Sequence, residues 1–304
     1  MDARIRALLT ANGQICTTSQ LSGADVDELT VARLVRAGIL VRIRRGLFAT
    51  GSVWREANPE QRLGLCARAV LADRPGAAAS HMSAVVLHGL PAWGGPAGRV
   101  DVVCSTPRRR LRSGIALHPW PAGITPVVVD GGSVVPASVA IAQVVVEHGV
   151  VPGLVCLDRA LHEGSVTTDA VVRAGDDLSL GPRARRRLEL AVEGSDATCE
   201  SVGETRTRVL LTDLGLHVRS QVDIRDEDGF VGRVDFLVGD RVVVEFDGMV
   251  KYAGADGRLA LQREKAREDR LRAAGYLVVR LVWADLDNPE RVFDLVQRAM
   301  RQAA

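Results

Sequence analysis

The sequence predicts a mixed α/β (α+β) protein made of three consecutive parts, and two patterns carry that prediction. Segments with apolar residues three or four positions apart, typical of helices, alternate with runs that have the two-residue period of strands. The last hundred residues then follow the order α-β-β-β-α-β-α. A chain of 304 residues is long enough for two or three domains. We place these domains at residues 1–55, 56–180 and 195–304.

The overall composition is that of a globular protein. Hydrophobic residues make up 47% of the chain and charged residues 25%. Neither an apolar run long enough to cross a bilayer nor a signal-peptide core is present, so we expect a cytoplasmic protein without membrane contact. The five cysteines are far apart and form no Cys-x-x-Cys pair, which predicts buried thiols in place of disulfides or a zinc site.

The first domain is predicted from its helical periods and caps. Residues 2–12 form a helix, Thr17 or Thr18 caps a second short helix, and a third helix runs from about Val26 to Ala37. Four residues of the third helix are expected to face the interior: Leu29, Ala32, Leu34 and Val35. Residues 39–49 then alternate as a hairpin that turns near Gly46. This order is the winged helix-turn-helix plan.

Arginines gather on the two elements of this plan that contact nucleic acid. The predicted DNA-binding residues are two on the third helix and three on the hairpin: Arg33, Arg36, Arg42, Arg44 and Arg45. The helix is expected to enter the major groove of double-stranded DNA while the hairpin arginines neutralise phosphates. The alternative is a winged helix used for protein contacts, with these arginines as solvated charge.

The middle domain is expected to mix helices and strands. Residues 58–75 and 77–90 read as helices, and residues 100–104 and 115–117 as strands. The arginine-rich segment 108–112 between the strands is either a second phosphate contact or a solvated turn. His81 and His88 lie near serines, but a Gly-x-Ser-x-Gly elbow is absent, so we interpret both as structural histidines.

Three short motifs connect the first two domains with a known family. Residues 80–84 (SHMSA), 87–91 (LHGLP) and 157–164 (LDRALHEG) resemble segments of the AbiEi-type antitoxin family. The resemblance covers about residues 1–175 and implies a winged helix before a mixed α/β domain, with a cognate toxin as partner. Many members carry an Arg-Thr…Asp pattern where this chain reads PASVAI at residues 136–141.

Carboxylates gather at one end of two predicted strands in the last domain. Asp235 lies on one strand, and Glu245 and Asp247 close the next on a common face. A hairpin about residues 239–240 pairs positions whose numbers add to 479 or 480, so Asp235 lies opposite Glu245 or its neighbour. Because such a cluster repels itself, it favours an oxygen-preferring cation. We therefore predict that Asp235, Glu245 and Asp247 bind Mg²⁺ or Mn²⁺.

The same segments resemble the PD-(D/E)XK nucleases, and within them the Vsr-like branch. The matching motifs are residues 234–236 (VDF), 245–248 (EFDG) and 275–280 (GYLVVR). The resemblance implies that Glu204 is the helical acid, that Asp235 and Glu245 are the metal acids, and that Asp247 takes the position of the motif lysine. Lys251 stands where branch members commonly have histidine, and it would offset charge on the phosphate.

These features predict a metal-dependent DNA endonuclease with Glu204, Asp235, Glu245, Asp247 and Lys251 as its catalytic residues. The main alternative is a non-catalytic DNA-binding regulator, or a type IV toxin-antitoxin antitoxin, with a degenerate nuclease fold. A protein-interaction adaptor is a third interpretation. In a purely structural interpretation, the three acids cap strands and pair with Arg233 or Arg241.

Overall fold

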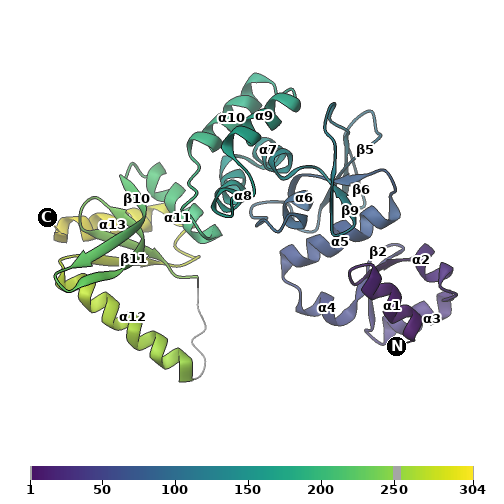
Figure 1. The fold of residues 1–304 in the computed structure, drawn as a ribbon, viewed down its shortest axis with the longest axis horizontal. Helices are drawn as coiled ribbons and strands as arrows, with labels where there is room; N and C mark the ends of the chain where they lie inside the picture. The colour runs from purple at the N-terminus through teal and green to yellow at the C-terminus, as the bar shows by residue number, and fades with distance from the viewer. Residues whose placement is uncertain (1, 249–254, 304) are drawn as a thin grey trace. The chain divides into compact units, whose positions relative to one another are not determined.

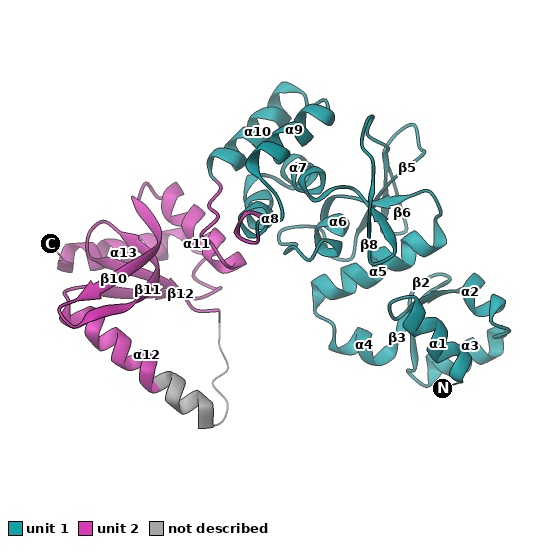
Figure 2. Cartoon of the chain, in the orientation of Figure 1, with its two compact units in different colours: residues 1–160, 164–194 teal, residues 161–163, 195–304 magenta. Residues whose placement is uncertain are grey.

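A computed structural model describes residues 2–248 and 255–303 of the chain, which divides into two compact units (Figure 2). Unit 1 comprises residues 1–160 and 164–194, and unit 2 comprises residues 161–163 and 195–304. Both units combine helices with a sheet, so the predicted mixed α/β class is confirmed. Each helix within the described ranges is too short or too polar to cross a membrane.

The N-terminal part of unit 1 is small and winged-helix-like (Figure 1). Thr17 caps the second helix in a capping box with Gln20, and Gly46 turns the hairpin with a φ of +76°. The three strands form an antiparallel sheet in the order β1-β3-β2. Its elements are α1 (Ala3–Ala11), β1 (Ile15–Thr17), α2 (Thr18–Gly23), α3 (Glu28–Arg36), β2 (Leu40–Arg44) and β3 (Leu47–Thr50).

The predicted helices and hairpin of this part are confirmed, but one inward residue is wrong. Leu29 is 57% exposed, whereas Val31 is buried. The reason is the helical period. The inward face of α3 carries Val31, Leu34 and Val35, and a residue two positions before Val31 lies on the opposite side of the helix. Leu29 therefore shares the outer face with Arg33 and Arg36, which lie four and seven positions later.

The rest of unit 1 packs helices on a six-stranded mixed sheet in the order β6-β7-β5-β4-β9-β8. The expected helix over residues 58–75 is confirmed, but residues 77–90 begin with a strand that pairs with Val102 and Val103. The alanines of that strand carried no local strand signal. The elements are α4 (Gly51–Glu56), α5 (Pro59–Asp73), β4 (Ala78–Ala79), α6 (His81–Leu87), β5 (Val100–Cys104), β6 (Arg110–Arg112), β7 (Ile115–Pro119), β8 (Val127–Val129), β9 (Gly132–Val134), α7 (Ala137–His148), α8 (Val150–His162, whose last residues count with unit 2), α9 (Thr168–Asp177) and α10 (Pro182–Glu193).

Unit 2 has the predicted order α-β-β-β-α-β-α. Its sheet runs β10-β11-β12-β13, with β12 and β13 parallel and the other pairs antiparallel. The β10–β11 hairpin is longer than expected, because its polar, exposed end reads as a loop in the sequence. The elements are α11 (Val202–Asp213), β10 (Val218–Asp226), β11 (Gly229–Val238), β12 (Val242–Phe246), α12 (Ala255–Ala273), β13 (Leu277–Leu281) and α13 (Pro289–Ala303).

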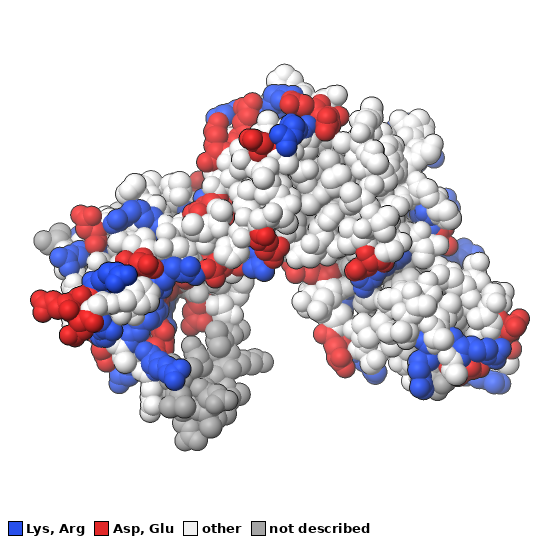
Figure 3. Space-filling model, viewed as in Figure 1, with Lys and Arg blue, Asp and Glu red and all other residues white. Residues whose placement is uncertain are grey.

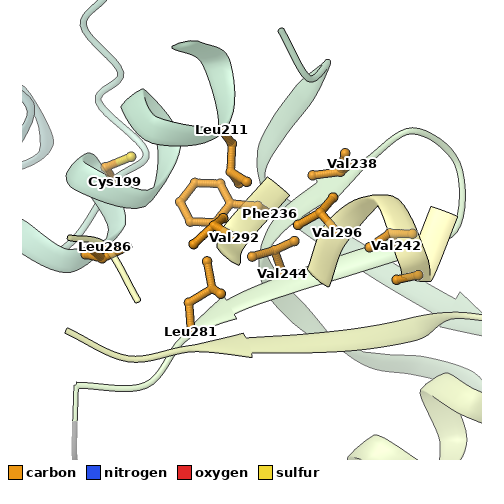
Figure 4. Packing of buried hydrophobic residues seen from close by; sticks show 11 residues of the cluster. Cys199, Leu211, Phe236, Val238, Val242, Val244, Leu281, Leu286, Val292 and Val296 are labelled. Atoms are coloured by element: carbon orange, nitrogen blue, oxygen red, sulfur yellow. The ribbon is translucent and has the colours of Figure 1, made fainter. Parts of the chain in front are cut away.

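Apolar side chains cover both faces of this sheet. On one face, side chains of β11, β12 and β13 pack against α11 and α13 around the fully buried ring of Phe236 (Figure 4). On the other face, Val234, Leu237 and Val243 pack with Leu271 of α12. Residues two positions apart in a regular strand point to the same face, but Val234 and Phe236 pack on different faces of the sheet. The alternation of side chains along β11 is therefore interrupted at Asp235. A carboxylate therefore enters this apolar layer at an irregular point of the strand.

Candidate functional site

The β11–β12 hairpin brings Asp235 and Glu245 together at one end of the sheet. Phe236 pairs with Val244, so the register adds to 480, one of the two predicted sums. Regular pairing between the two strands ends at Phe236 and Val244, and Asp235 and Glu245 are the next residues beyond it. The carboxylate Oδ2 of Asp235 accepts a hydrogen bond of 2.8 Å from the backbone N–H of Phe246. The hairpin thus fixes the position of the Asp235 side chain.

Glu204 reaches the same region from the first turn of α11. Ser201 caps this helix, and its hydroxyl donates to Glu204 Oε1 over 2.7 Å. Glu204 Oε2 accepts from the backbone N–H of Glu200 at 3.0 Å and from the amide of Gln221 at 2.9 Å. Gly203 makes the close approach of helix and strand feasible, because a Cβ at this position would overlap the ring of Phe246. The Glu204 carboxylate is therefore held in one orientation.

The three carboxylates act on one another electrostatically. The pKa of Asp235 is raised to about 6, mainly by burial and also by the charges of Glu204 and Glu245, while the hydrogen bond from Phe246 opposes the rise. The nearby Arg267 lowers it only in part. Asp235 is thus a half-buried acid whose negative charge the surrounding residues do not fully balance.

Arg267 of α12 is the nearest cation to Glu245. Its guanidinium lies 2.6 Å from Glu245 Oε1 and 3.1 Å from Glu264, and Arg280 of β13 lies 3.7 Å from the other oxygen of Glu245. Burial alone would lower the pKa of Arg267, but its hydrogen bond to Glu264 and the charge of Glu245 raise it. Sequence reasoning missed Arg267, because the helical period of α12 does not reveal which strand residue it meets.

The remaining predicted site residues lie nearby or outside the described part of the chain. Asp247 is the first residue after β12, and its backbone N–H donates to Leu281 over 2.8 Å. Lys251 lies outside the described residues. Arg233 pairs with Glu200, and Arg241 donates to the carbonyl of Ala274. These two arginines therefore have partners other than those of the purely structural interpretation.

The chemistry of this donor set fits a hard divalent cation. Mg²⁺ and Mn²⁺ prefer carboxylate oxygens, and a cation would favour the charged form of Asp235, which burial and, to a smaller extent, Glu204 and Glu245 disfavour. Asp235, Glu245 and Glu204 are the residues that would hold it, with Asp247 adjacent at the end of the strand. Over the residues that the structure describes, no three of these four side chains have ligand oxygens within 4.8 Å of one another, so the carboxylates would have to approach one another on binding.

Four of the five predicted DNA-binding arginines are exposed on the N-terminal part. Arg33 and Arg36 line the outer face of α3, and Arg42 and Arg45 lie on the hairpin. The guanidinium of Arg42 stacks over the ring of Phe48 at 5.4 Å. Basic side chains accordingly gather over the N-terminal helices (Figure 3). This surface suits contacts with phosphates.

The fifth arginine has a different role. Arg44 donates hydrogen bonds to the carbonyls of Ser113, Gly98 (2.8 Å) and Gly114 (3.2 Å). It thereby connects the hairpin to the turn between β6 and β7. Since its guanidinium is engaged in this way, the phosphate contacts proposed below use the four exposed arginines.

Comparison with known proteins gives a match in the N-terminal part of the chain. Residues 3–51 match the family model described as "Transcriptional regulator, AbiEi antitoxin". The match spans α1 to β3 and confirms the predicted resemblance for this segment. No curated protein matches the chain. The resemblance of the C-terminal domain to Vsr-like nucleases stays a prediction.

Proposed function

We propose that this protein binds double-stranded DNA through its winged-helix-like part and that unit 2 is a divalent-metal phosphodiesterase centre of the PD-(D/E)XK, Vsr-like type. One observation carries the proposal: Asp235, a half-buried acid with its pKa raised to about 6, interacts electrostatically with Glu204 and Glu245 just beyond the paired part of β11 and β12. Strongly perturbed acids of this kind concentrate at functional sites.

The DNA-binding part of the proposal rests on the outer face of α3 and on the hairpin. Leu29, Arg33 and Arg36 form one exposed stripe, which offers an apolar contact and two cations to a groove. Arg42 and Arg45 extend the positive surface to the hairpin, where they would contact phosphates.

The residues of unit 2 take separate roles in this proposal. Asp235 and Glu245 would hold Mg²⁺ or Mn²⁺, and Glu204 would complete the site or orient the attacking water. When bound, such a cation lowers the pKa of water and polarises the phosphoryl oxygen. The backbone N–H of Phe246 orients Asp235, and Arg267 keeps Glu245 in place. Arg267 also supplies the positive charge that the motif lysine, replaced here by Asp247, would provide.

The test is nicking of supercoiled plasmid with Mg²⁺, with Mn²⁺ and with EDTA. We expect cleavage only with metal, and a loss on the order of 100-fold or more in Glu245→Gln while DNA binding is retained. Glu227→Gln, the same change at an exposed turn of unit 2, is the matched control and should cleave like the wild type. Equal cleavage by Glu245→Gln would exclude this carboxylate site as the source of activity.

A second candidate is a non-catalytic DNA-binding regulator or antitoxin, with a toxin protein as partner. The pairing of Arg267 with Glu245 favours it, because a fixed guanidinium compensates a carboxylate that a metal would otherwise neutralise. The match of residues 3–51 to a regulator family points the same way. Tight DNA binding without cleavage of duplex, nicked, mismatched or single-stranded DNA would decide for this candidate.

A further inference from the structure

Polar side chains gather in the interior of unit 1, in the part of the fold to which the proposed function assigns no role. Six of the buried polar or charged residues that the structure describes meet there, and each is at most 8% exposed: Ser80, His81, Ser83, Asp101, His118 and Gln143. Burying so many polar groups is costly unless they are satisfied, and such clusters concentrate at sites of function. Sequence reasoning took His81 for a structural histidine and did not single out His118.

Three of these residues present metal-ligand atoms to one another. His118 Nε2 lies 2.9 Å from Asp101 Oδ1, and the rings of His81 and His118 stack with centroids 4.1 Å apart. One nitrogen or oxygen from each of the three residues lies within 4.8 Å of the others. They come from three elements: His81 begins α6, Asp101 is on β5, and His118 is on the adjacent parallel strand β7.

The backbone at His81 is strained in a way that points to function. His81 has a φ of +49°, in the left-handed region that a residue with a side chain adopts at a cost of roughly 1–2 kcal/mol. The strand-to-helix turn after β4 holds this conformation. The backbone N–H of His81 donates to Gln143 over 3.0 Å, and its ring Nδ1 lies 3.1 Å from Ser80 Oγ. The backbone N–H and one ring nitrogen of His81 thus have hydrogen-bond partners in a conformation that is unfavourable for a residue with a side chain.

Burial and neighbouring charges shift the pKa values of two residues of the cluster. Burial is the main cause that lowers the pKa of His81 to about 3. Burial opposes ionisation of Asp101, yet the hydrogen bond with His118 and the charge of Arg99 lower its pKa below the ordinary value. The cluster thus offers two imidazoles and one carboxylate.

We propose that His81, Asp101 and His118 form a transition-metal site suited to Zn²⁺. Two imidazoles and a carboxylate are an established zinc ligand set, and a fourth position is then left for water. In a tetrahedral shell with bonds of about 2.0 Å, ligand atoms lie roughly 3.3 Å apart. The 2.9 Å between His118 and Asp101 is close to that spacing, and a shift of roughly 1–2 Å in the His81 ring would complete the shell.

Outer hydrogen bonds of the kind that orient metal ligands are already present. Arg99 Nε donates to the second oxygen of Asp101 over 3.1 Å, and another nitrogen of the same guanidinium lies 3.3 Å from His148. The backbone N–H of Asp101 donates to Ser83 Oγ over 2.9 Å. Arg99 thereby orients the carboxylate of Asp101, as second-shell partners do in metal sites, while Ser83 fixes the backbone of Asp101.

The experiment is a Co²⁺ titration of the full-length chain, read by visible d–d absorption. The protein carries Asp235→Asn and Glu245→Gln, so that the carboxylates of unit 2 do not contribute. We expect one equivalent of Co²⁺ to give the intense band of a four- or five-coordinate site, and Zn²⁺ to displace it. His118→Gln should weaken Co²⁺ binding on the order of 100-fold.

His88→Gln is the matched control, because His88 hydrogen-bonds the carbonyl of Val135 and is not part of the cluster. It should leave the titration unchanged. The proposal is overturned if the folded chain with an intact cluster gives no band, or if the band survives in His118→Gln. The absence of a Co²⁺ band is measured on a protein whose His81, Asp101 and His118 are unchanged. This outcome therefore tests the proposal even if the His118→Gln variant fails to fold. Neither outcome depends on DNA cleavage.

Discussion

Asp235→Asn should stabilise unit 2 at neutral and alkaline pH in the absence of divalent cations. The amide has nearly the shape of the carboxylate, and its oxygen can still accept the 2.8 Å hydrogen bond from Phe246. What the change removes is a negative charge that burial and the neighbouring Glu204 and Glu245 disfavour. A carboxylate that lowers the stability of the folded protein is expected where the residue serves to bind a ligand.

The size of the effect follows from the pKa of Asp235, which is about 6 in place of 3.8. At 1.36 kcal/mol per pKa unit, this shift of about two units corresponds to at most about 3 kcal/mol, and solvent screening reduces it to about 1–2 kcal/mol. Because the folded pKa is raised, the cost to stability grows as pH rises from about 3.8 to about 6, is complete above that range, and disappears well below pH 3.8, where both states are protonated. The gain of Asp235→Asn should therefore be complete at pH 8 and much smaller at pH 4.

Urea unfolding in EDTA measures this gain. Trp283 is the single tryptophan of unit 2, and its ring contacts that of Phe246 at 4.8 Å, so it reports on the site when the other three tryptophans are changed to phenylalanine. Asp223→Asn, the same charge change at an exposed position of β10, should alter the free energy of unfolding by less than about 0.5 kcal/mol. An Asp235→Asn protein that is no more stable at pH 8, or equally stabilised at pH 4, would refute the reasoning.

Three further predictions test other parts of the account. Replacing both Arg42 and Arg45 with alanine should reduce the slope of log affinity for DNA against log salt concentration by roughly 2, whereas Arg44→Ala should leave this slope unchanged. Fluorescence anisotropy at several salt concentrations measures the slope. An unaltered slope in the double variant would count against the prediction. Gly203→Ala should destabilise unit 2 by about 1–3 kcal/mol in urea because its Cβ overlaps Phe246, whereas Gly248→Ala, in ordinary contact with that ring, should cost less than about 0.5 kcal/mol. Arg267→Ala should strengthen Mg²⁺ binding in calorimetry, because it removes a cation 2.6 Å from Glu245, and weaker binding would contradict that reasoning.

The parts of the fold that the sequence predicts are those with local signals. The capping box at Thr17 and the turns at Gly46 and before β12 each announce an element within a few positions. The last of these turns has three residues, 239–241, where two were expected, because Val238 pairs with Val242. The apolar residues of both strands predict a hairpin, and its register, with Phe236 opposite Val244, brings the chain segments of Asp235 and Glu245 next to each other. This is why the carboxylates of the candidate site could be predicted from the sequence.

The missing parts depend on contacts between distant segments. Arg267 meets Glu245 across the sheet, and Arg44 meets a turn about 70 residues later in the chain. His81, Asp101 and His118 likewise come from elements whose neighbours are set by the mixed order of the six-stranded sheet. Strand β4 was missed because its two alanines have no strand preference and pair only in the tertiary structure.

The central claim is that Asp235 and Glu245 bind a divalent cation, and calorimetric titration with Mg²⁺ at pH 6 tests it most directly. The titration is run in two buffers that differ in ionisation enthalpy. Near its pKa of about 6, Asp235 is partly protonated, so cation binding should release about half a proton per site. Saturable binding with this proton release, abolished by Asp235→Asn and by Glu245→Gln, is the predicted result. Absence of binding, or binding that persists unchanged in both variants, would contradict the account.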